Sequence, residues 1–239
     1  MTLERAQEII TQTALSYDKI AAHFSQTRQN LWTEFQEFLP YLKDNFKVLD
    51  FGCGNGRFGK IIQEKNIHYY GVDISANLLA IAQKNVPQGN FTLLAPDLKL
   101  PFPNNYFDLI VCLAAFHHIP SKILRQQILQ EFYQLLQPHG ILIISVWDFY
   151  HGSNKKYLLK SYFFWLKSFL FHKGQDWDRG DVLVPWKNAA GLIQTQRYFH
   201  IFSLKELKSL ILQNNFLIKV AKRVPHGRYY NNLIIIAQK

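Results

Sequence analysis

Hydrophobic positions along the chain change their spacing near residue 47. Before that point, apolar residues recur every three or four positions, which is typical of amphipathic helices. We therefore expect the first 46 residues to be helical. The positions that carry this pattern are Leu3, Ala6, Ile9, Ile10, Tyr17, Ile20, Ala21, Phe24, Trp32, Phe35, Phe38 and Leu39.

From residue 47 to residue 147, short apolar runs alternate with helical patterns. The runs predict strands at 47–51, 68–73, 91–94, 107–112 and 141–146, with helices near 57–65, 75–85 and 121–136 between them. Ser75 and Ser121 are placed to cap two of these helices. Because the runs are apolar throughout, we expect a parallel sheet that is buried on both faces by helices.

The alternation stops after Trp147. Residues 148–203 form an insertion, in which 154–172 is predicted to be a helix with lysines among its aromatic residues. Ser203 opens a helix near 204–213, and the runs at 216–222 and 232–237 are close enough to pair antiparallel. We expect one domain with an N-terminal helical cap (1–46), a core (47–147), an insertion that caps the substrate (148–203), and a C-terminal helix and strand pair (204–239).

The charge is unevenly distributed along the chain of 239 residues, whose formal net charge is +10. Residues 1–150 carry 12 basic and 13 acidic side chains, whereas residues 151–239 carry 15 and 4. The whole excess therefore belongs to the second part, where it is a candidate contact surface for a nucleic acid or an anionic membrane. Surplus lysine that only aids solubility is the alternative.

Nothing in the sequence indicates export or a bilayer span. The N-terminus has early acidic residues, and no apolar stretch reaches the roughly 18 residues that a span requires. Two cysteines, Cys53 and Cys112, are too few for a disulfide framework or a zinc cluster, and we expect buried thiols. We predict a cytoplasmic protein without a transmembrane segment or a metal site.

A glycine-rich turn follows the first predicted strand, in the run Asp50-Phe51-Gly52-Cys53-Gly54-Asn55-Gly56. Glycine allows positive φ and close approach of the backbone to a ligand. Asp73 ends the second strand, where a carboxylate can accept both hydroxyls of a ribose. These features alone also fit a nicotinamide enzyme.

Further residues distinguish the two cofactors. Asp50 precedes the glycines, and Ala95-Pro96-Asp97-Leu98 follows the third strand. With these positions, residues 47–147 resemble the class I methyltransferases that use S-adenosylmethionine. The resemblance implies an α/β, Rossmann-like sheet of seven strands in the order 3-2-1-4-5-7-6, with the last strand antiparallel. It further implies that Asp50 faces the amino end of the cofactor and that Asp97 faces its adenine.

A narrower resemblance extends over most of the chain. The strings Tyr17–Arg28, Phe116–Ser121, Asp181–Trp186 and Arg197–Phe202 are similar to those of the tRNA wobble-uridine carboxymethyl methyltransferases. That family esterifies the carboxylate of 5-carboxymethyluridine, which is already ionised at neutral pH and needs no general base. Eukaryotic members work with a small activator subunit, which this sequence neither predicts nor excludes.

The resemblance implies two groups of site residues. The expected catalytic or substrate-gripping residues are His118, Arg197, His200 and Arg228. The expected cofactor-binding residues are Tyr17, Arg28, Asp50, Gly52, Cys53, Gly54, Asp73, Ile74, Asp97, Leu98 and Leu113. Arg28 could equally grip the substrate, bind the carboxylate of the cofactor or pair with a local acid, and His118 could equally be structural.

Two questions stay open at this point. The chain could instead be a small-molecule or lipid methyltransferase associated with a membrane, or a noncatalytic subunit that binds S-adenosylmethionine. The helix at 154–172 could cover the site, contact tRNA or lie in a membrane interface. We favour a tRNA methyltransferase with a helix that covers the site.

Overall fold

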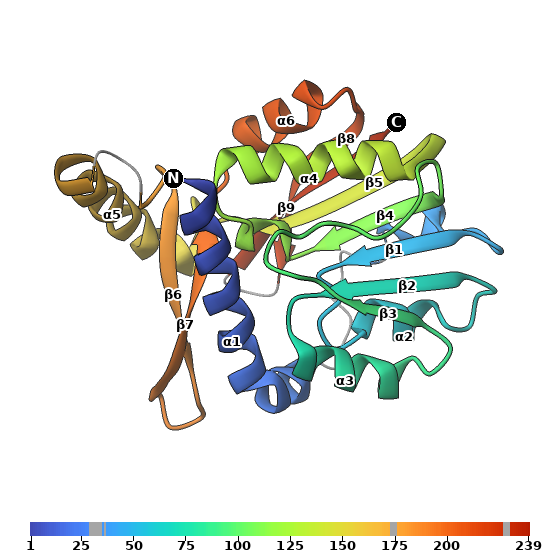
Figure 1. The fold of residues 1–239 in the computed structure, drawn as a ribbon, viewed down its shortest axis with the longest axis horizontal. Coiled ribbons are helices and arrows are strands. Elements are labelled where there is room, and N and C mark those ends of the chain that lie inside the picture. The colour runs from blue at the N-terminus through green and yellow to red at the C-terminus, as the bar shows by residue number, and fades with distance from the viewer. Residues whose placement is uncertain (29–34, 36, 173–175, 227–229) are drawn as a thin grey trace.

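A seven-stranded sheet runs through the molecule with helices on both faces (Figure 1). The computed structural model describes residues 1–28, 35, 37–172, 176–226 and 230–239. The strands of this sheet are β1 (Lys47–Phe51), β2 (His68–Asp73), β3 (Asn90–Leu93), β4 (Phe107–Leu113), β5 (Leu136–Trp147), β8 (Leu217–His226) and β9 (Tyr230–Gln238). The helices are α1 (Leu3–Thr27), α2 (Arg57–Ile62), α3 (Ala76–Asn85), α4 (Lys122–Leu135), α5 (Lys156–His172) and α6 (Leu204–Gln213), with short 3₁₀ turns η2 (Leu39–Tyr41), η3 (Phe116–His118) and η4 (Gly152–Lys155).

The order of strands in the sheet confirms the predicted topology. It is β3-β2-β1-β4-β5-β9-β8, in which β1 to β5 are parallel and β9 runs antiparallel to both of its neighbours. Two further strands form a separate hairpin, so the seventh strand of the large sheet is numbered β9. Without the hairpin the order is the expected 3-2-1-4-5-7-6.

The central strands are buried on both faces, as their apolar runs predict. In β4, Ile110 and Cys112 belong to a core cluster that contains residues of α4 and α6. The alternate residues Leu109 and Val111 belong to a second cluster with Phe58 of α2. Since side chains alternate between the faces of a strand, only a run without polar positions can fill both cores.

The insertion contains a hairpin that the sequence did not predict. Strands β6 (Asp181–Lys187) and β7 (Ile193–His200) pair antiparallel and form a second sheet. Pro185 weakens the strand pattern in β6 because it cannot donate a backbone hydrogen bond. Helix α1 packs against both β7 and α3, and Figure 1 shows it between the hairpin and the large sheet. The hairpin thus reaches the carboxyl ends of the parallel strands.

Several local expectations need correction. Residues 42–46 are not helical, and Trp32 lies outside the described residues. The hydroxyl of Ser121 does not cap α4, because its backbone adopts a φ of 63° and the side chain makes no capping hydrogen bond. By contrast, the hydroxyls of Ser75 and Ser203 do accept backbone hydrogen bonds at the starts of α3 and α6, as predicted.

The structure also bears on the two cysteines and on membrane-spanning helices. Cys53 and Cys112 are free and buried. Among the helices of the described residues, none has both the length and the hydropathy that crossing a bilayer requires.

Replacement of Gly52 by alanine should destabilise the fold. Gly52 has a φ of 73°, and an added Cβ would lie 2.3 Å from the Cβ of Ala115. We expect Gly52→Ala to lower the free energy of unfolding by about 3 kcal/mol, from a left-handed backbone and an overpacked contact. Urea denaturation measures this loss.

Gly191→Ala is the matched control, because Gly191 has a φ of 79° and its added Cβ would meet no atom within 4 Å. This variant should lose only about 1 kcal/mol, the cost of the backbone conformation alone. Equal losses in the two variants would contradict the predicted contact with Ala115.

Candidate active site

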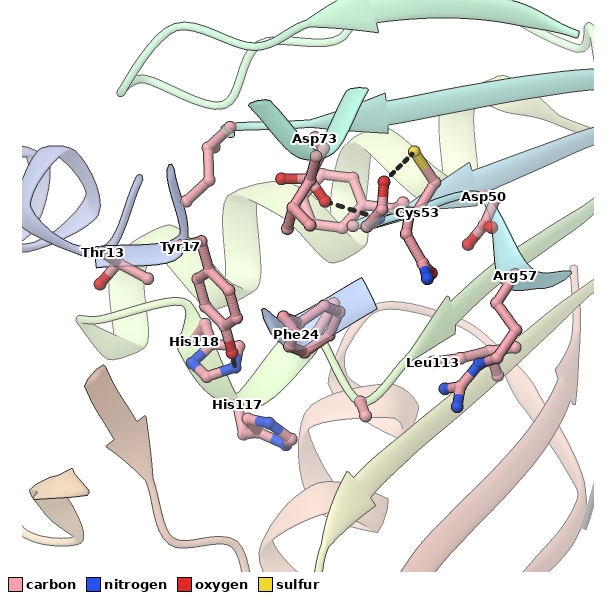
Figure 2. Close-up of a pocket in the computed structure, with 18 of the residues that line it drawn as sticks. Thr13, Tyr17, Phe24, Asp50, Cys53, Arg57, Asp73, Leu113, His117 and His118 are labelled. Atoms are coloured by element: carbon pink, nitrogen blue, oxygen red, sulfur yellow. Dashed lines mark hydrogen bonds between the residues drawn. The ribbon is translucent and has the colours of Figure 1, made fainter. Parts of the chain in front are cut away.

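The glycine-rich turn after β1 is fixed by hydrogen bonds to β2. The amides of Gly52 and Cys53 donate to the carbonyl of Val72 over 2.8 and 3.0 Å. The carboxylate of Asp73, at the end of β2, accepts from the amide of Gly54 over 2.8 Å and from the amide of Ser75 over 2.9 Å. The turn and the carboxylate therefore have one defined arrangement at the edge of a pocket (Figure 2).

Two buried carboxylates, Asp50 and Asp73, line this side of the pocket. Burial raises the pKa of Asp50 to about 7, although the hydroxyl of Tyr69 donates a hydrogen bond of 2.7 Å to its Oδ2. Burial also raises the pKa of Asp73, and the backbone hydrogen bonds from Ser75 and Gly54 oppose this effect. Burying a carboxylate is unfavourable without a compensating cation or donor.

The pocket residues fit the predicted cofactor. Neither Asp50 nor Asp73 forms a salt bridge with any side chain in the described part of the chain, so they can receive the ammonium and hydroxyl groups of S-adenosylmethionine. Apolar side chains that can pack on its adenine ring also line the pocket. They include Ile74, Leu78, Leu94, Leu98 and Leu113.

Most of the predicted cofactor residues meet in this pocket. Asp97 does not, because its side chain is exposed and its Oδ1 accepts from the amide of Lys99. The predicted residues that line the pocket are Tyr17, Arg28, Asp50, Gly52, Cys53, Gly54, Asp73, Ile74, Leu98 and Leu113.

A chain of hydrogen bonds crosses the pocket opposite the glycine turn. Nη1 of Arg197 donates to the hydroxyl of Tyr17 over 3.2 Å. The Tyr17 hydroxyl lies 2.8 Å from Nε2 of His118, and Figure 2 shows this hydroxyl directed at the His118 ring. Nδ1 of His118 lies 2.6 Å from the carbonyl oxygen of Tyr198, which can only accept. Nδ1 therefore carries the proton of a neutral ring, and Nε2 accepts from Tyr17.

This arrangement determines what His118 can do. Burial, followed by the nearby charge of Arg197, lowers the pKa of His118 to about 3. The ring is therefore neutral at physiological pH, and its acceptor nitrogen is occupied by Tyr17. His118 positions Tyr17 and cannot serve as a general base without breaking that hydrogen bond.

Arg197 and Arg28 give the pocket a cationic end. Arg197 is 4% exposed, lies 4.8 Å from the ring centre of Trp186, and forms no salt bridge within the described residues. Its Nε atom is buried without a hydrogen-bond partner. Burial, and then the charge of Arg197, lowers the pKa of Arg28. The predicted pairing of Arg28 with a local acid is absent from the described residues, so both guanidinium groups can receive an anionic ligand.

Of the other two predicted catalytic residues, His200 does not line the pocket. His200 is buried between two acids, with Nδ1 2.8 Å from Asp181 and Nε2 2.9 Å from Glu206. These contacts connect β7 with β6 and α6, which is a structural task. Arg228 lies outside the described residues.

Sequence reasoning missed several residues that line the pocket, among them Thr13, Phe24, Arg57 and His117. Helical spacing could have found two of them. Thr13 precedes Tyr17 by four positions and Phe24 follows it by seven, so the three share one face of α1. The sequence pattern indicated an apolar face that includes Tyr17 and Phe24. It did not indicate that this face forms a wall of the pocket.

Comparison with known proteins supports the presence of a methyltransferase domain. Residues 49–144 match a family model described as a methyltransferase domain. The chain is 28% identical to a tRNA (carboxymethyluridine(34)-5-O)-methyltransferase of Schizosaccharomyces pombe, with full coverage of both chains. It is also 35% identical to a Mus musculus protein of the same activity name. That alignment covers 59% of this chain and 21% of the mouse protein.

A solved structure confirms the fold. An S-adenosylmethionine-dependent methyltransferase from Methanosarcina mazei superposes with a TM-score of 0.67 at 23% identity, over 88% of this chain and 98% of the other. The domain match confirms the predicted methyltransferase domain, and this superposition confirms its fold. The chain spans the whole of the S. pombe relative, but only about a fifth to a third of several other curated relatives.

The ionisation of Asp50 should make cofactor binding depend on pH. A bound ammonium group favours the carboxylate form and lowers the pKa of Asp50 below its value of about 7. Affinity for S-adenosylhomocysteine, which carries the same amino group, should therefore rise with pH up to about 7, by at most roughly tenfold per unit, and then level off. Isothermal titration calorimetry between pH 5.5 and 8 measures this.

Asp50→Asn is the control, because an amide does not ionise in this range. This variant should bind more weakly, by about 2 kcal/mol, and its affinity should be nearly constant over the same pH range. A slope that persists in Asp50→Asn would assign the titration to another group.

Proposed function

We propose that this chain, which carries an S-adenosylmethionine-dependent methyltransferase domain, esterifies the carboxylate of a 5-carboxymethyl-type uridine at the wobble position of tRNA. The observation that carries this proposal is the pair of pocket arginines, Arg28 and Arg197, which have no carboxylate partner in the described residues. They lie in the same pocket as the two acids that fit the cofactor. The carboxylate of a bound substrate and that of the cofactor, with one negative charge each, would balance these two positive charges.

The names of the relatives agree with an RNA carboxylate as acceptor. Those of S. pombe, Mus musculus and Arabidopsis thaliana are named for methylation of carboxymethyluridine 34. The basic excess of residues 151–239 supports tRNA as the partner, because lysines and arginines attract the phosphate backbone. Such an enzyme would act in the cytoplasm.

The chemistry requires positioning more than proton transfer. S-adenosylmethionine supplies an electrophilic methyl carbon on its sulfonium, and an ionised carboxylate can attack that carbon without a base. Arg197 would hold the carboxylate in line, while its hydrogen bond to Tyr17 fixes the direction of the guanidinium. Neutral His118 in turn fixes Tyr17. The aromatic side chains of Phe24 and Trp147 line the pocket and exclude water from the reacting atoms.

The decisive measurement is transfer of labelled methyl groups from S-adenosylmethionine into tRNA isolated from cells that lack this protein. Nucleoside analysis should place the label in a 5-carboxymethyluridine methyl ester, and mild alkali should release it, since esters hydrolyse whereas N-methyl and ribose methyl groups do not. Alkali-stable label in another nucleoside would contradict the proposal. Label in small carboxylic acids, with none in tRNA, would favour the small-molecule methyltransferase instead.

Loss of the Arg197 guanidinium should weaken catalysis selectively. Arg197→Gln removes a charge-assisted contact worth about 2 kcal/mol, so kcat/KM for tRNA should fall roughly 30-fold or more. The Kd for S-adenosylhomocysteine should change less than threefold, which also shows that the variant is folded. Arg197→Lys should recover only part of the activity, because lysine lacks the bidentate geometry of arginine.

Arg179→Gln is the matched control, since Arg179 is exposed and belongs to the same insertion. It should retain nearly full kcat/KM. If Arg179→Gln and Arg197→Gln lost activity equally, general electrostatic attraction of RNA would explain the effect. The proposed contact between Arg197 and the substrate carboxylate would then be wrong.

A further inference from the structure

The outward side of α5 carries a row of exposed apolar side chains. Leu159 is 78% exposed, Phe163 74% and Leu170 64%, and Tyr162 and Phe169 are also more than half exposed. Their spacings of three, four and seven residues place them on one side of the helix. We call these five residues the outer face of α5. Soluble proteins rarely expose a contiguous apolar patch of this kind without a function.

The opposite side of α5 anchors the helix to the hairpin. Phe164 stacks on Trp177 with ring centres 5.1 Å apart. The hydroxyl of Ser168 accepts from the amides of Asp176 and Trp177, and Nζ of Lys160 donates to the carbonyl of Leu183. The orientation of α5 is therefore fixed, and the outer face points away from the protein.

The position of α5 rules out the interpretation that this helix covers the active site. None of the α5 side chains that the structure describes is among those that line the pocket, and Figure 1 shows the helix at the far end of the molecule from β3. The hairpin, which supplies Arg197, is the part of the insertion that reaches the pocket. The outer face must serve another purpose.

The charged residues of α5 itself are all lysines. The sequence has no acidic residue between Asp148 and Asp176, whereas it has five lysines in that interval. Lys156 and Lys167 are exposed and lie on one flank of the outer face. An apolar stripe bordered by lysines is complementary to a surface that has an apolar interior and negatively charged groups on its outside.

We propose that α5 docks the protein on an anionic lipid surface, with the outer face in the interfacial region and the flanking lysines at the headgroups. A helix with aromatic and leucine side chains on one side and lysines beside them has the pattern of an interfacial helix. Lysines near an anionic leaflet add electrostatic attraction to the burial of apolar side chains. The helix lies on the bilayer, in keeping with the finding that no described helix can cross one.

Two other occupants fit the outer face less well. RNA would satisfy the lysines and could stack on the aromatic rings, but it offers no apolar surface to Leu159 and Leu170. A second copy of the chain would bring the lysines of two helices close together, and like charges repel. An anionic bilayer complements both the apolar and the basic side chains.

Co-sedimentation with vesicles tests the proposal. The full chain should bind vesicles of phosphatidylglycerol and phosphatidylcholine at least tenfold more tightly than vesicles of phosphatidylcholine alone, and 0.5 M NaCl should weaken this binding. The double variant Leu159→Glu/Leu170→Glu should lose at least tenfold in affinity for the mixed vesicles. Its methyl transfer and cofactor affinity should not change, because neither residue lines the pocket.

The matched control is Leu212→Glu/Leu217→Glu, which changes two leucines that are 55% and 59% exposed on α6 and β8. It alters the net charge equally and should bind vesicles like the unmodified chain. Equal binding by both double variants, or no binding by the unmodified chain, would overturn the proposal. Loss of tRNA affinity without loss of vesicle binding would instead assign the outer face to RNA, and dissociation of a dimer would assign it to a second copy. These outcomes are independent of whether tRNA is the methyl acceptor.

Discussion

The hydroxyl of Tyr17 lies between the guanidinium of Arg197 and the ring of His118, and the arrangement of the whole pocket depends on it. The three residues belong to α1, the hairpin and the loop after β4, and the hydrogen bonds join positions 101 and 180 residues apart in the chain. Each partner is buried or partly buried, so removing Tyr17 would cost Arg197 and His118 one hydrogen bond each in a poorly solvated site. The N-terminal helix and the insertion are thereby held against the sheet.

The two acids of the pocket lie apart from two of its arginines. Asp50 and Asp73 lie by the glycine turn, with Arg57 near Asp50 (Figure 2), whereas Arg28 caps the end of α1 and Arg197 belongs to the hairpin. Charges in a poorly solvated site interact more strongly than in water, so each pair favours a ligand group of opposite sign. The faces of Trp186 and Phe199, whose ring centres lie 4.8 and 5.2 Å from the Arg197 guanidinium, offset part of the cost of burying it. This arrangement suits ligands that together place a cationic group near the two acids and a carboxylate near Arg28 and Arg197.

Local patterns were sufficient to predict the sheet and the contact between the glycine turn and Asp73. The glycine turn and Asp73 are set by the ends of two adjacent parallel strands, so their contact follows from the strand pattern alone. Asp97 was placed by the same logic and lies outside the pocket, since the loop after β3 exposes it and buries Leu98 instead. The hairpin was missed because Pro185 interrupts one strand and because Gly191, in the turn between the strands at 188–192, was not recognised as a hairpin signal.

The error over His200 has the same origin. The sequence string from Arg197 to Phe202 contains both a cation and a histidine, and both were assigned to the substrate. In a strand, side chains alternate between two faces, so positions 197 and 200 point in opposite directions. Tyr198 and His200 lie on one face, where both contact Asp181, while Arg197 and Phe199 lie on the other with Trp147. Had the hairpin been recognised, this alternation alone would have excluded one of the two residues, and the buried pairing of His200 with two acids identifies which.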